Sequence, residues 1–156
     1  MNSILLDTSF CIRLLKRDDE FHKNAVDYFQ HFLDKKIEMF LSTIVISEYS
    51  VKDDIANLPL RTMKIIPFDF SDGKISGEFH SILLEKKSRI QDIDRLMVKD
   101  DCKLIAQMYT RQIEAFITKD RKSFTQIFEP IQKTKGFSVE LLDLTISLAT
   151  FKGELF

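Results

Sequence analysis

Four acidic side chains, those of Asp7, Glu48, Asp101 and Asp120, are the groups in this sequence that could act together in chemistry. Asp7 directly follows a short apolar run, and Asp120 lies two residues beyond another. Each aspartate taken alone is equally well explained as the N-cap of a helix. If both runs are parallel strands of one sheet, however, the two carboxylates lie at the same rim.

Glu48 and Asp101 are predicted to interrupt the apolar faces of helices. At helical spacing Glu48 shares a side with Ile44, Val51 and Ile55. On its predicted helix, Asp101 likewise shares a side with a larger set of apolar residues, Met97, Val98, Leu104, Ile105 and Met108. A buried ionised carboxylate needs a cation, hydrogen bonds or a raised pKa. For one acid a buried ion pair is as good an explanation as function, but four acids at one rim favour a metal centre.

The ligand types predict a hard divalent cation, Mg²⁺ or Mn²⁺, because all four candidates offer oxygen atoms. No Cys or His pair has zinc-ligand spacing. The three histidines do not form a Ser-His-Asp or Cys-His pattern, and there is no glycine-rich phosphate loop.

Alternating strands and helices are predicted to position these acids, which makes the fold class α/β with a central, mostly parallel sheet flanked by helices. The expected strands span residues 3–6, 37–41, 63–67, 115–118 and 138–144. The expected helices span residues 8–16, 19–35, 43–57, 69–87, 94–111 and 120–128. Prolines at positions 59 and 130 are expected to end two of these helices, and residues 86–92 are expected to form an exposed loop.

Length and composition predict one globular domain, because the chain has 156 residues, 44% hydrophobic and 30% charged. A net charge of −1 excludes a protein that grips nucleic acid by bulk charge alone. Local basic clusters occur at Lys86, Lys87 and Arg89, and at Lys119, Arg121 and Lys122, where a solvated face is the simpler explanation. Two cysteines, no export signal and no apolar stretch of membrane-spanning length predict a soluble cytoplasmic protein without a membrane contact.

Four acid-bearing fragments resemble the PIN-domain ribonuclease family in order and spacing, over about residues 2–128. They are ILLDTSF (4–10), STIVISE (42–48), DCKLIA (101–106) and ITKDRKSF (117–124). The resemblance implies a single three-layer domain and a metal-dependent endoribonuclease, with Asp7, Glu48, Asp101 and Asp120 as the acidic quartet and Thr118 as the accompanying hydroxyl. Asp101 fits the pattern better than its neighbour Asp100.

The resemblance also implies roles and partners. Asp7 and Asp101 are expected to bind the metal directly, Glu48 to bind it through water or to orient the attacking water, and Asp120 with Thr118 to complete a second ion's surroundings. Members of this size resemble VapC toxins, which implies an RNA substrate, a small antitoxin partner and a homodimer. The nuclease domain is expected to span residues 1–144, with residues 145–156 as an extension packed on the domain or on a partner.

Two other functions fit parts of the pattern. A phosphoaspartyl phosphatase would also place a nucleophilic Asp7 after its first strand, but it needs a second acid where this chain has Ser9. A PIN-like scaffold that binds RNA or protein without cutting is the non-enzymatic alternative.

Overall fold

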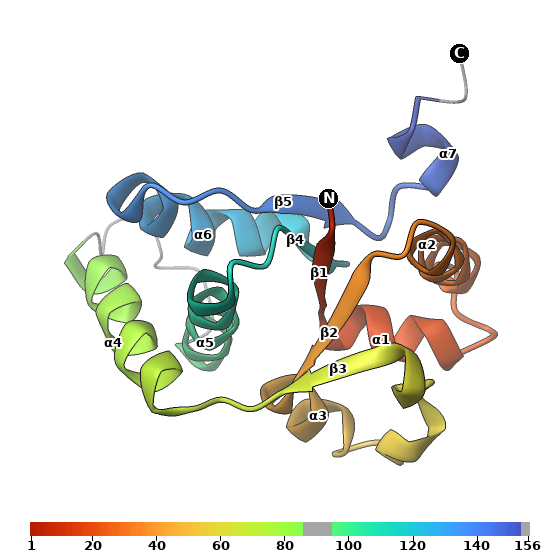
Figure 1. Ribbon diagram of the computed structural model, residues 1–156, viewed down its shortest axis with the longest axis horizontal. Helices are drawn as coiled ribbons and strands as arrows, with labels where there is room; N and C mark the ends of the chain where they lie inside the picture. The colour runs from red at the N-terminus through yellow and green to blue at the C-terminus, as the bar shows by residue number, and fades with distance from the viewer. Residues whose placement is uncertain (86–94, 154–156) are drawn as a thin grey trace.

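Five strands form one sheet in the order β3-β2-β1-β4-β5, and every neighbouring pair is parallel. The computed structural model, shown in Figure 1, describes residues 1–85 and 95–153. The strands are β1 Ser3–Leu6, β2 Glu38–Ser42, β3 Met63–Ile66, β4 Ala115–Thr118 and β5 Glu140–Asp143. The predicted α/β class with a parallel central sheet is therefore confirmed.

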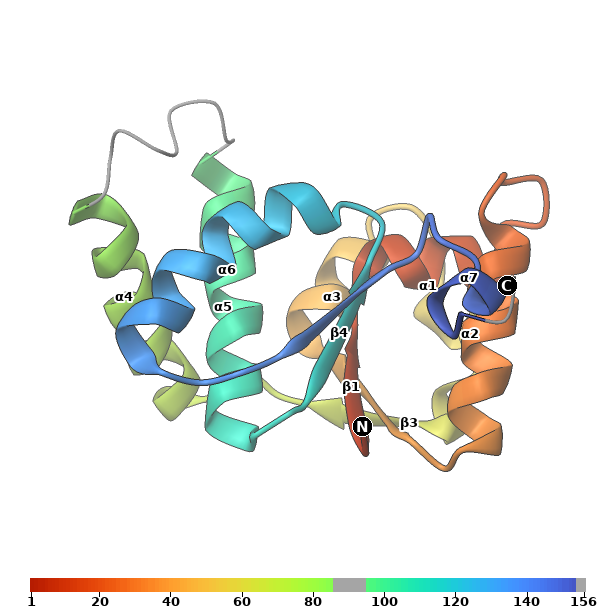
Figure 2. The same ribbon diagram turned by 90° about the horizontal axis from the view of Figure 1, so that it is seen from above.

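Helices cover both faces of the sheet. Figures 1 and 2 place α1 Thr8–Leu15, α2 His22–Asp34 and α7 Leu148–Phe151 on one face. The opposite face carries α4 Phe70–Glu85, α5 Arg95–Arg111 and α6 Arg121–Lys135. The short helix α3, Thr43–Tyr49, contacts both α1 and α5 and so bridges the two layers.

The two central strands are apolar because both of their faces are covered. Ile4, Leu5 and Leu6 of β1 are fully buried, and all four residues of β4 are buried as well. Such continuous apolar runs are typical of parallel strands between two helical layers. This burial fixes the place where β1 and β4 end, and with it the positions of the acids that follow them.

The strand order reverses direction between β1 and β4. From β1 the chain moves outward through β2 to β3, then crosses back over the sheet to β4 and β5. In open α/β sheets, the loops on either side of such a reversal diverge and leave a crevice at the carboxyl ends of the strands. Asp7 and Asp120 follow the two strands that border this crevice.

The helix predicted for residues 43–57 is shorter than expected, which corrects that prediction. It ends at Tyr49, and residues Ile55–Asn57 form a separate 3₁₀ turn. Tyr49 Oη donates to Asp53 Oδ2 at 2.6 Å, and the backbone N–H of Ala56 donates to Asp54 Oδ1 at 2.9 Å. The carboxylates of these adjacent aspartates accept hydrogen bonds from a nearby hydroxyl and a backbone N–H, and such local bonds compete with a continuous helix.

The helix predicted to end before Pro130 is longer than expected, and that prediction was wrong. Helix α6 continues to Lys135 with Pro130 inside it. The lost hydrogen bond is offset by burial, because Ile131, one residue beyond the proline, is fully buried together with Ile127. The helix ends at Gly136, whose φ of 70° is readily adopted by glycine and whose N–H donates to Gln132 O at 2.7 Å.

The remaining predicted elements differ from the structure only at their ends. The predicted loop over residues 86–92 and its basic cluster lie outside the described residues. Within residues 1–85 and 95–153, none of the helices combines the length and apolarity needed to cross a bilayer.

The chain beyond β5 packs against α2. Tyr28 Oη donates to Ile146 O at 2.9 Å, and the rings of Tyr28 and Phe151 lie 6.2 Å apart. Asn24 adds a side-chain hydrogen bond of 3.0 Å to Leu144 O. The division of the chain at residue 144 stays a proposal.

Candidate active site

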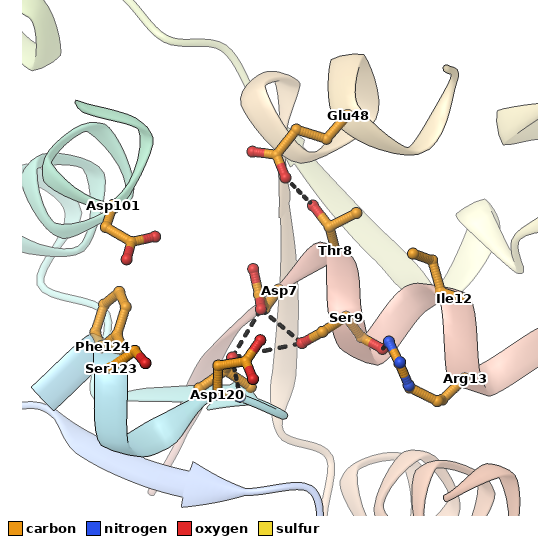
Figure 3. Close-up of a pocket in the computed structure, with 11 residues that line it drawn as sticks. Asp7, Thr8, Ser9, Ile12, Arg13, Glu48, Asp101, Asp120, Ser123 and Phe124 are labelled. Atoms are coloured by element: carbon orange, nitrogen blue, oxygen red, sulfur yellow. Dashed lines mark hydrogen bonds between the residues drawn. The ribbon is translucent and has the colours of Figure 1, made fainter. Parts of the chain in front are cut away.

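The four predicted acids and Thr118 all line one pocket at the carboxyl ends of β1 and β4, as Figure 3 shows for the acids. Asp7 links β1 to α1, and Asp120 links β4 to α6. Glu48 extends from α3 and Asp101 from α5, so the acids reach the pocket from four segments. The pocket encloses about 220 Å³. The pocket is open to solvent and has room for several water molecules.

Asp7 is held by two hydroxyl groups. Ser9 Oγ donates to Asp7 Oδ2 at 2.6 Å, and Thr118 Oγ1 donates to the same oxygen at 2.8 Å. Neither hydroxyl engages Oδ1, which Figure 3 shows on the other side of the carboxylate. Burial raises the pKa of Asp7, with a smaller contribution from repulsion by Asp120, although the hydroxyl hydrogen bonds oppose the shift.

The same hydroxyls connect the two loops that carry Asp7 and Asp120. Ser9 Oγ accepts a hydrogen bond of 3.0 Å from the backbone N–H of Lys119, and Thr118 Oγ1 accepts one of 3.1 Å from that of Asp120. The N–H of Asp7 itself donates to Ile117 O at 3.2 Å. Thr118 is only 2% exposed. These bonds fix the position of one loop relative to the other.

Glu48 reaches the pocket with its carboxylate end, although the residue as a whole is exposed. Thr8 Oγ1 donates to Glu48 Oε2 at 2.8 Å. Burial of the carboxyl end raises the pKa of Glu48, and repulsion by Asp7 and Asp100 adds to the shift against the opposing Thr8 bond. The sequence argument for this residue was wrong in one respect, because Val51 is 79% exposed and lies beyond α3. No continuous apolar face surrounds Glu48.

Asp101 is an acid with a strongly raised pKa. Its helix α5 buries the predicted apolar neighbours Val98, Leu104, Ile105 and Met108. Burial, followed by repulsion from Asp7, Glu48, Asp100 and Asp120, raises the pKa of Asp101 to about 8. Within the part of the chain that the structure describes, no hydrogen bond or ion pair reaches the Asp101 carboxylate. A carboxylate in these surroundings is stabilised by either a proton or a cation.

The neighbouring Asp100 has a different environment. Its side chain is 40% exposed and faces Lys103 Nζ at 3.5 Å, and it is not among the described residues that line the pocket. Asp101, which the sequence pattern preferred, is the one of the pair that lines the pocket.

The donor set fits a hard cation in chemistry, since it consists of carboxylate and hydroxyl oxygens. In the described ranges, no three Asp, Glu, His or Cys side chains are close enough to hold an ion as they stand. The largely desolvated Asp101 carboxylate, without a partner among the described residues, is the observation that favours a cation. Direct ligation of one ion by three of the acids would therefore require them to move closer together.

Four further polar residues of the pocket were not predicted, namely Ser123 in α6 and three residues on the Asp7 side of the pocket. Thr8 and Ser9 directly follow Asp7 in the sequence, and Arg13 lies one helical turn beyond Ser9. The only sequence signal was their spacing from Asp7 at the start of a helix. Ser9 donates to Asp7 rather than supplying the second acid that a phosphoaspartyl enzyme needs.

The basic residues next to Asp120 do not line the pocket within the described part of the chain. Arg121 and Lys122 are exposed at the start of α6. Lys119 Nζ lies 5.7 Å from the centre of the Phe21 ring and makes a cation–π contact with it.

Comparison with known proteins identifies the class. The family model of the PIN domain matches residues 4–128, and the chain therefore belongs to the PIN domain family. None of the curated proteins matches this chain in sequence.

Solved structures share the fold at low sequence identity. A chain of DNA-bound VapBC from Salmonella typhimurium is 18% identical with a TM-score of 0.57, over 92% of this chain and 99% of that one. A chain of VapBC2 from Rickettsia felis, bound to a DNA fragment from its promoter, is 20% identical with a TM-score of 0.61, over 90% of this chain and 99% of that one. The Sarcin-Ricin loop cleaving toxin VapC20 of Mycobacterium tuberculosis is 16% identical with a TM-score of 0.51, over 72% and 86%.

Proposed function

We propose that this PIN-domain protein is a metal-dependent endoribonuclease that acts as a VapC-like toxin. The observation that carries the proposal is the largely desolvated carboxylate of Asp101, which has no partner among the described residues and shares a pocket with three other acids at the strand-order reversal. The family assignment supports nuclease chemistry, and the solved VapC20, described as a Sarcin-Ricin loop cleaving toxin, supports RNA as the substrate class.

Asp7 and Asp101 would hold Mg²⁺ or Mn²⁺ directly, and Asp120 would complete the surroundings of a second ion. A bound divalent cation supplies a lower pKa for a coordinated water and stabilisation of the leaving oxygen. Glu48 orients the attacking water and takes up its proton. Thr118, whose hydroxyl donates to Asp7, keeps that carboxylate directed toward the pocket.

The same assignment extends to partners and place of action. The solved VapBC complexes support a small antitoxin as the partner of this chain. A homodimer and a cytoplasmic location belong to the proposal as expectations for a toxin of this family. A scaffold that binds RNA without cutting is the alternative, and the experiment below separates the two.

The test is an RNA cleavage assay with purified protein and MgCl₂ or MnCl₂. Cleavage is expected with either salt, and excess EDTA is expected to abolish it. Asp7→Asn should lower the rate by more than about 100-fold, because it removes a proposed ligand. Asp34→Asn is the matched control, since this exposed aspartate lies at the end of α2, away from the pocket. Cleavage that persists in Asp7→Asn would falsify the assigned site, and RNA binding without cleavage would favour the scaffold.

A further inference from the structure

Arg13 is the cation of the pocket. Among the described residues that line it, Arg13 is the only one with a positively charged side chain, whereas four carry a carboxylate. It extends from α1 one turn beyond Ser9, and its side chain is 17% exposed. An acidic pocket that accepts RNA must neutralise phosphate charge as well as its own. The proposed metal-binding role of the acids therefore does not explain why Arg13 lines the pocket.

The guanidinium of Arg13 is oriented but not saturated. Its Nη1 donates to Ser9 O at 3.2 Å, and its Nε lies 3.5 Å from Asp19 Oδ2 without forming a hydrogen bond. Asp19 is itself fixed, because its Oδ1 accepts the N–H of Phe21 at 2.9 Å. An arginine has five N–H donors in a planar fork that matches two oxygens of a phosphate. In the described structure most of these donors are not used by the protein.

The position of Arg13 in the pocket determines which phosphate of a bound RNA strand it can contact. In Figure 3, Arg13 and Asp101 lie on opposite sides of Asp7, and the Arg13 guanidinium lies beside the backbone of Ser9. The acids that would hold the metal therefore occupy one part of the pocket and the arginine another. A strand whose scissile phosphate lies among the acids would place a neighbouring phosphate at the arginine.

We infer that Arg13 binds a backbone phosphate that flanks the scissile bond, and so sets the register of the RNA strand in the pocket. This inference rests on the proposed ribonuclease function and adds a residue that contacts the substrate. The competing explanation is structural: Arg13 would only connect α1 to the following loop through Asp19.

The salt dependence of binding distinguishes the two explanations. The probe is a fluorescein-labelled single-stranded oligouridylate, titrated with protein by anisotropy in calcium chloride at several KCl concentrations. Loss of one phosphate contact lowers the slope of log K against log salt by about 0.7 for a single strand. Arg13→Gln should show this decrease and bind about tenfold more weakly at low salt. Arg13→Lys should keep the slope of the wild type, because it keeps the charge.

Two matched variants control for charge and for structure. Arg61→Gln makes the same substitution at an exposed site before β3, at the opposite rim of the sheet, and should leave the slope unchanged. Asp19→Asn removes the ion pair with Arg13 but keeps the guanidinium, and should also leave the slope unchanged. If Asp19→Asn reproduces the effect of Arg13→Gln, the structural explanation is correct and the inference fails.

The activity assay separates this inference from the proposed function. Arg13→Gln should raise KM with little change in kcat, because the contact is made equally in the ground state and the transition state. Metal-dependent cleavage with unchanged KM and salt slope in Arg13→Gln would overturn the role of Arg13 and leave the nuclease proposal intact. A changed slope in a protein that never cleaves RNA would support Arg13 and overturn the nuclease proposal. A wild type that does not bind the oligonucleotide would overturn both.

Discussion

Thr118 Oγ1 donates a hydrogen bond of 2.8 Å to Asp7 Oδ2, although the two residues are 111 positions apart in the chain. The bond joins the end of β4 to the end of β1 at the reversal of strand order. It also combines two functions in one hydroxyl, since the same oxygen accepts the N–H of Asp120. The geometry of the acidic pocket therefore depends on a neutral side chain.

Thr118→Val tests this dependence. The valine keeps the shape but leaves the Asp120 N–H without its acceptor and removes a donor from Asp7, so we expect a loss of about 1–3 kcal/mol in the free energy of unfolding. Affinity for Mn²⁺ should fall by about 10–100-fold, as for other residues that orient metal ligands. Calorimetric titration and denaturant unfolding measure the two effects. Thr118→Ser, which keeps the hydroxyl, should restore most of both, and a serine variant as weak as the valine would contradict this role.

The pKa of Asp101 predicts how pH affects the metal-free protein. Because this pKa rises from its ordinary value of 3.8 to about 8 in the folded state, the folded chain holds a proton that the unfolded chain has released. Stability should therefore fall as pH rises from about 4 to about 8. In EDTA at pH 8, Asp101→Asn should raise the melting temperature by at least about 2–4 °C, which corresponds to roughly 1 kcal/mol for a chain of this size.

The same measurement at pH 4 provides the control for Asp101. At pH 4 the wild-type carboxyl is protonated in the folded state and lies close to its ordinary pKa in the unfolded state, so little of the pH-dependent cost remains and the advantage of the asparagine variant should shrink. An equal gain at both pH values would show that charge is not its cause.

Asp100 and Asp101 should differ sharply in activity although they are adjacent. Asp101 lines the pocket, whereas Asp100 is 40% exposed and faces Lys103. Asp101→Asn should reduce RNA cleavage by more than about 100-fold, and Asp100→Asn by no more than a few-fold, since exposed ion pairs contribute little. Initial rates at saturating metal measure both. The reverse ranking would mean that the wrong acid of the pair has been assigned.

Arg111 should be essential for folding rather than for chemistry. Its Nη1 donates to Asp72 Oδ1 at 2.7 Å, and Asp72 is fully buried in the first turn of α4. Burial alone would raise the pKa of Asp72, but hydrogen bonds from Arg111, the Asp69 N–H and Thr110 together hold it below its usual value. Arg111→Met leaves this carboxylate buried without its cation and should cost about 3–5 kcal/mol in denaturant unfolding.

The ion pair of Lys64 with Glu38 is the comparison for Arg111. These side chains are 61% and 51% exposed, so Lys64→Met should cost less than about 1 kcal/mol. Equal costs for the two methionine variants would contradict the importance of burial.

Sequence patterns predicted the elements whose burial is continuous. Strands β1 and β4 appear as uninterrupted apolar runs, so their limits and the rim that holds Asp7 and Asp120 followed directly. Where local side-chain bonds or tertiary burial decide, the patterns failed. Helix α3 ends early because Asp53 and Asp54 bond to nearby groups, and α6 passes Pro130 because the core accepts Ile131.

The four acids of the site were predicted from the sequence. The residues that hold these acids in position were not. Acidic residues after strands or among apolar residues are visible in a sequence, since they conflict with the pattern around them. The hydroxyl of Ser9 fits the start of any helix, and its bond to the Lys119 N–H spans 110 positions. Arg13 likewise has the spacing of an ordinary helix residue. Only the folded arrangement shows that both face the pocket.

The order of the strands also sets when the pocket can exist during synthesis. Residues are added from the N-terminus, so β1, β2 and β3 can emerge from the ribosome while β4, the neighbour of β1 on its other side, has not yet been made. Until β4 and the loop with Asp120 have emerged, Asp7 lacks its hydrogen bond from Thr118, and the crevice has only one wall. A nascent chain is thus unable to form the complete acid cluster while most of it is still being translated. Assembly of the pocket therefore waits for the segment that carries Thr118 and Asp120.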